Sequence, residues 1–302
     1  MGASSLIQVD ELAGLLAGPR GVPAGRPVLL DVRYRMSGPT GRPEFERAHI
    51  PASSYVDLNT DLATIRPDGV GGRHPMPTAR TFTAAMRSAG VIMSRPVVAY
   101  DDWASLPASR LWWMLRHFGF ADVRVLDGGI TAWIAADQPT ASGRSMPGAG
   151  DFSPTRPGIG RLLHATDAKA YAGRRLLLDA RPADRFRGEN VTIDAVAGHI
   201  PGAVGAPALA TVDSRGRFLR AEELAVHLWP LTTGEAAGPP GPGAEPSDEA
   251  RPVGTDCGSG GQATPLALAL AVGGIWIGDP VAPGADVDVG VIADSRDSQR
   301  QG

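Results

Sequence analysis

Hydrophobic residues along the chain gather in short runs, and one longer segment between them has helical spacing. The runs are residues 28–32, 96–100, 123–126 and 176–180. Largely apolar runs of this length are typical of strands buried on both faces of a parallel sheet. Between residues 106 and 118, Leu111, Leu115 and Phe118 recur at helical spacing. Strands that alternate with helices predict an α/β fold, in which helices cover both faces of a mainly parallel sheet.

Three short sequences occur twice in the chain, in the same order. The pairs are Leu-Leu-Asp-Val-Arg with Leu-Leu-Asp-Ala-Arg (29–33 and 177–181), Ala-His-Ile-Pro-Ala with Gly-His-Ile-Pro-Gly (48–52 and 198–202), and two copies of Arg-Pro-Val (95–97 and 251–253). The copies are 148, 150 and 156 residues apart. Because this spacing is that of a whole domain, the sequence predicts a tandem duplication.

The duplication divides the chain into two predicted domains. Residues 1–137 form the first and residues 161–302 the second. Residues 138–160 are rich in Pro, Gly and Ser, which is typical of a linker. A second Gly- and Pro-rich segment, residues 234–251, lies inside the second copy and predicts a long loop.

Composition narrows the class of protein. The chain has 29 basic and 32 acidic side chains, for a net charge of −3, which argues against a nucleic-acid-binding surface. The longest apolar stretch, residues 266–277, is shorter than the ~20 residues of a membrane span. The first residues show no basic segment before an apolar one, as a signal peptide would. We therefore expect a soluble, cytoplasmic protein that binds neither nucleic acid nor a membrane.

The one cysteine, Cys257, lies in a segment that favours reactive chemistry. A short strand at Pro252 and Val253 precedes it, a glycine-rich loop follows, and a helix is predicted to begin near Pro265. Backbone N–H groups of such a loop can point toward one atom, and a helix N-terminus adds partial positive charge. Both effects stabilise a thiolate. The alternative, a buried structural cysteine, fits poorly with polar and glycine neighbours.

These motifs together resemble the tandem-domain rhodanese family, the thiosulfate and 3-mercaptopyruvate sulfurtransferases. In the second copy the matching segments are Leu-Asp-Ala-Arg (178–181), Arg-Phe-Arg-Gly (185–188), Gly-His-Ile-Pro-Gly-Ala (198–203) and Cys-Gly-Ser-Gly (257–260). In the first copy they are Gly-Gly-Arg-His-Pro (71–75), Tyr-Asp-Asp (100–102) and Leu-Asp-Gly-Gly (126–129) with Trp133. The resemblance covers roughly residues 8–265 and implies two rhodanese-like domains.

The resemblance implies sulfur transfer through a cysteine persulfide. The Cys257 thiolate would take a sulfane sulfur from 3-mercaptopyruvate or thiosulfate, and a thiophilic acceptor would then remove it. Cyanide, thiols and thioredoxin are candidate acceptors. The first copy has Asp101 where the second has Cys257, so it would be the inactive half. No cofactor is implied, and the histidines lack the spacing of metal ligands, so no metal site is predicted.

The resemblance also implies which residues bind the donor. Arg185 matches the arginine that holds the anionic end of the donor, a task that suits a guanidinium, although a surface salt bridge is the alternative. Gly258, Ser259 and Gly260 form the loop after the nucleophile, and His74 is a further candidate. Because Gly258 and Ser259 are neutral where thiosulfate enzymes tend to be basic, they favour 3-mercaptopyruvate, with thiosulfate left open.

Several repeated polar residues are expected to serve the fold instead. They are Asp31 and Arg33 with their counterparts Asp179 and Arg181, and the pair His49 and His199.

The chain departs from the family pattern after about residue 261. Gly261 and Gln262 stand where Val and a hydroxyl residue are usual, and nothing in the tail matches the usual closing Gly-Ser-Trp-x-Glu-Trp segment. Residues 254–256, Gly-Thr-Asp, also stand where the family usually has an apolar or aromatic run. These departures motivate a second hypothesis, a degenerate paralogue that binds sulfur species or a partner. A cysteine phosphatase is disfavoured, because the loop lacks an arginine for phosphate.

Overall fold

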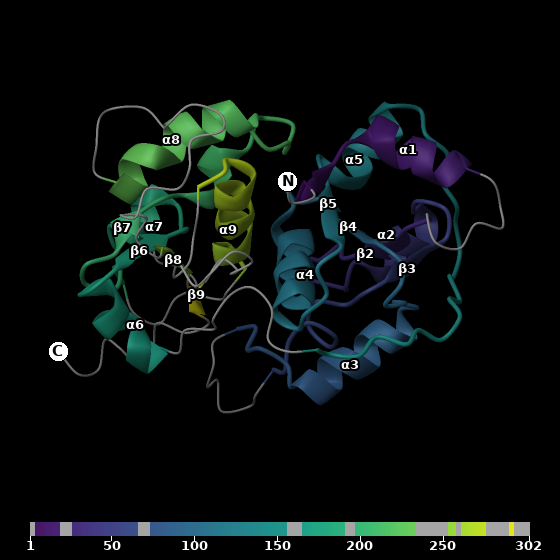
Figure 1. Cartoon of the computed structure of the whole chain (residues 1–302), viewed down its shortest axis with the longest axis horizontal. Helices are drawn as coiled ribbons and strands as arrows, with labels where there is room; N and C mark the ends of the chain where they lie inside the picture. Colours follow the sequence, from purple (N-terminus) through teal and green to yellow (C-terminus); the bar gives the residue numbers. More distant parts are fainter. Residues whose placement is uncertain are drawn as a thin grey trace. The chain divides into compact units, whose positions relative to one another are not determined.

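The computed structural model describes residues 4–18, 26–65, 73–155, 165–190, 197–233, 253–257, 261–275 and 290–292. The chain divides into two compact units. Unit 1 comprises Met1–Ile65, Met76–Gly158 and Ser214–Arg217, and unit 2 comprises Arg66–Pro75, Ile159–Asp213 and Phe218–Gly302. Each unit contains one sheet with helices packed against it (Figure 1).

The sheet of unit 1 has five strands, in the order β1-β5-β4-β2-β3, and all of its pairings are parallel. The strands are β1 (Leu6–Ile7), β2 (Val28–Asp31), β3 (Ser53–Tyr55), β4 (Val97–Tyr100) and β5 (Val123–Leu126). Every residue of β2 and β4 is buried, as expected of central strands that are covered on both faces.

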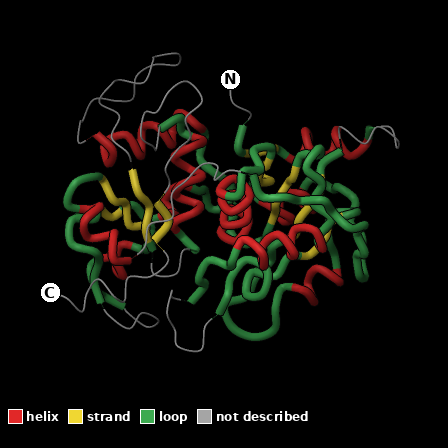
Figure 2. The backbone as a smooth tube through the Cα atoms, turned by 60° about the horizontal axis from the view of Figure 1, so that its bottom comes forward, coloured by secondary structure: helices red, strands yellow, loops and turns green. Residues whose placement is uncertain are grey.

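Helices cover both faces of this sheet (Figure 2). They are α1 (Val9–Ala17), α2 (Arg42–Arg47), α3 (Ala79–Ser88), α4 (Leu106–His117) and α5 (Gly129–Ala135). Leu12 of α1 and Trp133 of α5 share one apolar cluster with Leu29 and Val98 of the sheet. Helix α4 packs against β4 and β5 and is buried from Leu106 through Leu115. The apolar positions predicted at residues 106–118 therefore form a core helix.

The sheet of unit 2 has the parallel order β7-β6-β8-β9. Its strands are β6 (Leu176–Asp179), β7 (Val204–Gly205), β8 (Val253–Asp256) and β9 (Gly290–Ile292). The helices are α6 (Ala165–Ala172), α7 (Ala183–Phe186), α8 (Ala221–Thr233), α9 (Ala263–Val272) and the 3-10 turn η1 (Ala208–Thr211). The strand order repeats β3-β2-β4-β5 of unit 1, and the predicted fold class is confirmed.

The strand before Cys257 is longer than its sequence indicates. All four residues of β8 are buried, although Gly254, Thr255 and Asp256 do not make an apolar run. A Cβ atom on Gly254 would lie 2.7 Å from Cε1 of Tyr171, so glycine lets α6 approach this strand closely. Helix α9 begins at Ala263, slightly before the predicted start at Pro265, because proline is tolerated in a first helical turn.

The described part of the segment expected to link the domains packs within unit 1. Ala141 forms an antiparallel bridge with His49. Phe152 is fully buried and meets Phe82 edge to face, with ring centroids 5.6 Å apart. The boundaries expected at residues 137 and 161 stay predictions, and the predicted loop 234–251 lies mostly outside the described residues.

Candidate active site

Cys257 lies between the end of β8 and the start of α9. Its side chain is buried, with 1% of the residue exposed. The backbone N–H groups of Gln262 and Ala263 donate to its Sγ atom, with N···S distances of 3.2 and 3.3 Å. N–H groups at the start of a helix have no partner within the helix and carry partial positive charge. The sulfur therefore lies where an anionic form, thiolate or persulfide, is stabilised.

The other predicted donor-binding residues differ in how the structure places them. Gly258, Ser259 and Gly260 lie outside the described residues. Arg185 is half-buried on α7, which follows β6. Strands β6 and β8 are parallel neighbours, so α7 and Cys257 leave the same edge of the sheet. His74 is half-buried, and its role stays a prediction.

The repeated Asp-x-Arg motif forms a buried ion pair at the end of β6. Arg181 donates from Nε to both carboxylate oxygens of Asp179, at 2.9 and 3.1 Å, and from Nη2 to Oδ2. The same Nη2 atom donates to the carbonyl of Gly198 at 2.8 Å. Arg181 thus ties the strand end to the residue before His199. The expected structural role of this pair agrees with its geometry.

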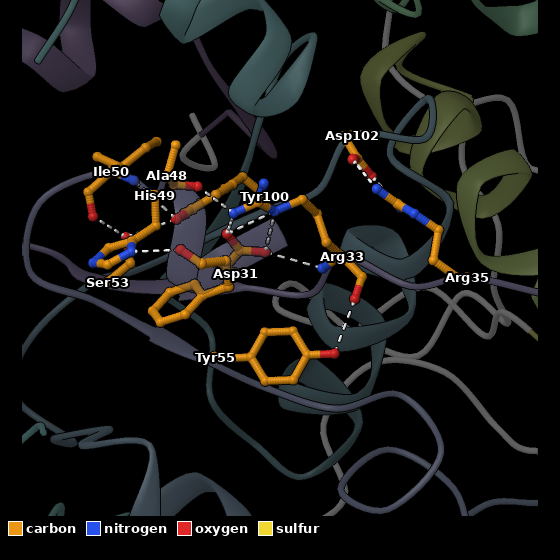
Figure 3. Close-up of polar contacts among 11 residues, drawn as sticks. Asp31, Arg33, Arg35, Ala48, His49, Ile50, Ser53, Tyr55, Tyr100 and Asp102 are labelled. Carbon is orange, nitrogen blue, oxygen red and sulfur yellow. Dashed lines mark hydrogen bonds and ion pairs between the residues drawn. The ribbon is translucent and has the colours of Figure 1, made fainter. Parts of the chain in front are cut away.

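The same arrangement recurs at the end of β2 in unit 1 (Figure 3). Arg33 holds Asp31 through Nε and Nη2, and its Nη2 donates to the carbonyl of Ala48 at 2.6 Å. Near it, Arg35 forms a two-pronged pair with Asp102, with N···O distances of 2.9 and 2.7 Å. This second pair could not be predicted from the sequence, because the two residues are far apart along the chain.

The two repeated histidines also have matching environments. Nδ1 of His49 donates to the carbonyl of Phe45, and Nδ1 of His199 donates to the carbonyl of Phe186, both at 2.8 Å. Each imidazole stacks on that phenylalanine, with ring centroids 4.0 and 3.8 Å apart. The structural role expected for these histidines agrees with this geometry. In unit 2 the contact anchors the end of α7, the helix that carries Arg185.

Comparison with known proteins identifies the family. Residues 9–136 match the family described as Rhodanese-like domain. SseB of Mycobacterium tuberculosis, whose name as a thiosulfate sulfurtransferase is provisional, is 36% identical over 92% of this chain and 95% of its own. Human 3-mercaptopyruvate sulfurtransferase is 30% identical over 92% of this chain and 88% of its own. The chain belongs to the rhodanese family of sulfurtransferases.

A solved structure extends this similarity to the fold. The crystal structure of SseA from Escherichia coli, reported with the fold and mechanism of 3-mercaptopyruvate sulfotransferases, aligns with a TM-score of 0.71. It is 25% identical, and the alignment covers 95% of this chain and 98% of that one. The resemblance inferred from the motifs is confirmed, and this rhodanese-family chain is a sulfurtransferase.

In this sulfurtransferase, the first copy has a carboxylate where the second has its thiol. Asp101 follows β4 and is buried, with 1% of the residue exposed. Its carboxylate accepts N–H groups of Trp103, Ser105 and Ala108, at 2.7, 3.1 and 2.9 Å. Burial raises the pKa of Asp101 to about 6, and these N–H groups limit that rise. The replacement of cysteine by Asp101 could be predicted from the sequence, whereas this set of hydrogen bonds could not.

Within the described ranges, no three His, Cys, Asp or Glu side chains gather as metal ligands do. Among the helices of those ranges, none has the length and apolar composition needed to cross a membrane.

Proposed function

We propose that this sulfurtransferase moves a sulfane sulfur from 3-mercaptopyruvate or thiosulfate to a thiophilic acceptor, through a persulfide on Cys257. The observation that carries the proposal is the pair of N–H groups, from Gln262 and Ala263, that converge on Sγ. Such stabilisation raises the thiolate fraction near neutral pH, where a free cysteine, with a pKa of about 8.5, is mostly protonated. The persulfide that follows is an anion in the same place.

Sulfur transfer then proceeds in two steps. With thiosulfate, Sγ attacks the outer sulfur, the S–S bond breaks, and sulfite leaves with the electron pair of that bond. With 3-mercaptopyruvate, Sγ attacks the thiol sulfur, the C–S bond breaks, and the thiol proton passes to the enolate carbon, which gives pyruvate. In both cases Cys257 holds a persulfide anion. A nucleophilic acceptor removes the outer sulfur and restores the thiolate.

Arg185 is the proposed clamp for the anionic end of the donor. It lies on α7, at the sheet edge from which Cys257 also emerges. A planar guanidinium suits a carboxylate or a sulfonate-like group, because it offers two parallel N–H donors. Gly258, Ser259 and Gly260 are the proposed loop around the transferred sulfur, and His74 is a further candidate for mercaptopyruvate binding. The lack of basic side chains in this loop supports 3-mercaptopyruvate as the preferred donor.

The acceptor and the compartment are part of the same proposal. A low-molecular-weight thiol or thioredoxin is the proposed acceptor, and the cytoplasm is the proposed location. The single cysteine of the chain supports both assignments, because the reducing cytoplasm would keep the Cys257 thiol available between cycles.

Turnover assays test the proposal. The full chain is supplied with cyanide and either 3-mercaptopyruvate or thiosulfate, and thiocyanate is measured. We expect turnover with both donors, a higher kcat/KM for 3-mercaptopyruvate, and a return to the uncatalysed rate in Cys257→Ser. A folded protein that forms the persulfide but shows no turnover with any acceptor would favour the second hypothesis, a module that binds sulfur species.

A further inference from the structure

A cavity with a volume of about 570 Å³ lies in unit 1, at the amino ends of the parallel strands. Its wall includes Val28, the first residue of β2, and Arg95, which comes two residues before β4. The buried pair of Asp31 and Arg33 lies at the opposite, carboxyl edge of the sheet (Figure 3). The cavity is therefore distinct from the cradle of Asp101, which lies at that carboxyl edge as well.

The wall of the cavity is mainly apolar and comes from segments that are far apart along the chain. Leu16 belongs to α1, Leu29 to β2 and Trp133 to α5. Ile92 follows α3, and residues 147–149 come from the segment that has the composition of a linker. This volume and this wall are those of a small-molecule site, since such sites measure about 300–1,000 Å³ and are mainly hydrophobic.

Two arginines give the wall its positive charge. Arg26 donates from Nη2 to the carbonyl of Leu16. Arg95 donates from Nε to the carbonyl of Arg26, at 2.8 Å, and from Nη2 to the carbonyl of Pro27, at 3.2 Å. Within the described residues neither arginine has an ion pair, and no Asp or Glu lines the cavity. Carbonyl groups thus hold both guanidinium groups, and their charges stay unbalanced.

An anion with an apolar body satisfies both parts of this wall. A guanidinium suits a carboxylate, because it stays charged and its N–H groups can bind both oxygens. The apolar surface supplied by α1, β2 and α5 favours contact with a hydrocarbon chain or an aromatic ring. A strongly hydrated dianion such as inorganic phosphate would lose its water against the same surface, at a high cost in free energy. The wall therefore favours a single carboxylate group over phosphate.

We propose that this cavity binds a monocarboxylate with an apolar body, such as a medium-chain fatty acid, with the carboxylate at Arg26 and Arg95. Its chain lies against Trp133, whose Nε1 atom donates to the carbonyl of Pro139 at 2.8 Å. This hydrogen bond holds the indole ring in place before a ligand enters. The proposal does not depend on sulfur transfer, because the cavity belongs to the unit that lacks Cys257.

Calorimetric titration of the full chain with octanoate tests this assignment. At constant ionic strength, octanoate should bind wild type at one site. The neutral octanamide and the cationic octylamine should bind at least about tenfold more weakly, because they lose the charged hydrogen bonds. Inorganic phosphate should not compete with octanoate. Equal affinities for octanoate and octanamide would overturn the proposal, because the two arginines would then contribute nothing.

Single substitutions test which residues hold the carboxylate. Arg95→Gln and Arg26→Gln should each weaken octanoate binding about tenfold or more and leave octanamide binding close to that of wild type. Arg80→Gln removes an exposed arginine of α3 that does not line the cavity, and this matched control should bind octanoate as wild type does. Arg185→Lys should also bind as wild type, which separates the cavity from the proposed donor site.

Circular dichroism shows whether each variant folds. Arg26→Gln removes one hydrogen bond, to the carbonyl of Leu16, so this variant decides the question if Arg95→Gln does not fold. No saturable binding of octanoate by folded wild type, or unchanged affinity in the folded arginine variants, would overturn the proposal. Loss of binding in Arg185→Lys would place octanoate at the donor site and would overturn it as well.

Discussion

The carboxylate of Asp101 occupies, in the first copy, the place that the sulfur of Cys257 occupies in the second. Each residue follows the strand that pairs with the Asp-x-Arg strand. Each side chain accepts backbone N–H groups from the segment that begins the next helix. The duplicated loop is therefore an anion cradle in both copies, and the first copy fills it with its own carboxylate.

A cysteine placed in the first cradle should become acidic. We expect the thiol of Asp101→Cys, made in a Cys257→Ser background, to have a pKa below the ~8.5 of a free cysteine, because three N–H donors already point at this position. The pH dependence of its alkylation by iodoacetamide measures this pKa. The same protein unfolded in urea is the control, and a folded-state pKa equal to or above the unfolded one contradicts the account.

The repeated histidines allow a matched comparison. His49→Ala and His199→Ala each remove a hydrogen bond and a stacked ring, so both should lose about 1–3 kcal/mol of stability. His199→Ala alone should raise the KM for the sulfur donor, because it loosens the helix that carries Arg185. Thermal unfolding and donor kinetics on both variants separate the two effects. Equal changes of KM would argue against Arg185 as the clamp.

Arg185 can be tested against a neighbouring arginine. Arg185→Lys should raise the KM for either donor about tenfold, close to 1.4 kcal/mol, because lysine loses the two-pronged contact with the donor anion. Arg187 is exposed on the same segment and pairs with Glu189. Arg187→Lys should leave KM and kcat as in wild type. A KM that rises equally in both variants would indicate a general effect of positive charge.

Gly254 provides a test of packing beneath the nucleophile. Gly254→Ala should lower the free energy of unfolding by about 1–3 kcal/mol, because the new methyl group would clash with Tyr171 and Leu177. Where the methyl group meets no obstacle, alanine in a strand is up to ~1 kcal/mol more stabilising than glycine. The sign of the change in unfolding free energy therefore shows whether the methyl group fits. Gly14→Ala, where nothing lies within 4 Å of the new methyl group, is the control and should stabilise α1. A neutral or stabilising Gly254→Ala would contradict the close approach of α6.

The features that could be predicted from the sequence are those set by residues adjacent along the chain. Buried parallel strands require continuous apolar residues, so β2, β4, β5 and β6 could be predicted within a residue or two. The strand-loop-helix around Cys257 could be predicted because glycines and a first-turn proline have direct backbone consequences. The structural role of Asp179 and Arg181 followed from their duplication in a copy without a thiol.

The rest depends on tertiary contacts that a sequence does not display. The cradle of Asp101 requires positive φ angles of 49° and 60° at Ala104 and Ser105, neither of which is a glycine. Phe152 lies in a segment with the composition of a linker, and only its contacts with other rings place it in a core. The burial of Asp256 beside Asp179 depends on the register of two strands that are far apart along the chain.

The intact mass of the protein after incubation with a sulfur donor tests the central claim most directly. The account predicts a gain of one sulfur atom with 3-mercaptopyruvate or thiosulfate, its loss on addition of cyanide, and no gain in Cys257→Ser. No gain in wild-type protein that is folded by circular dichroism would contradict a persulfide on Cys257, as would an equal gain in the serine variant.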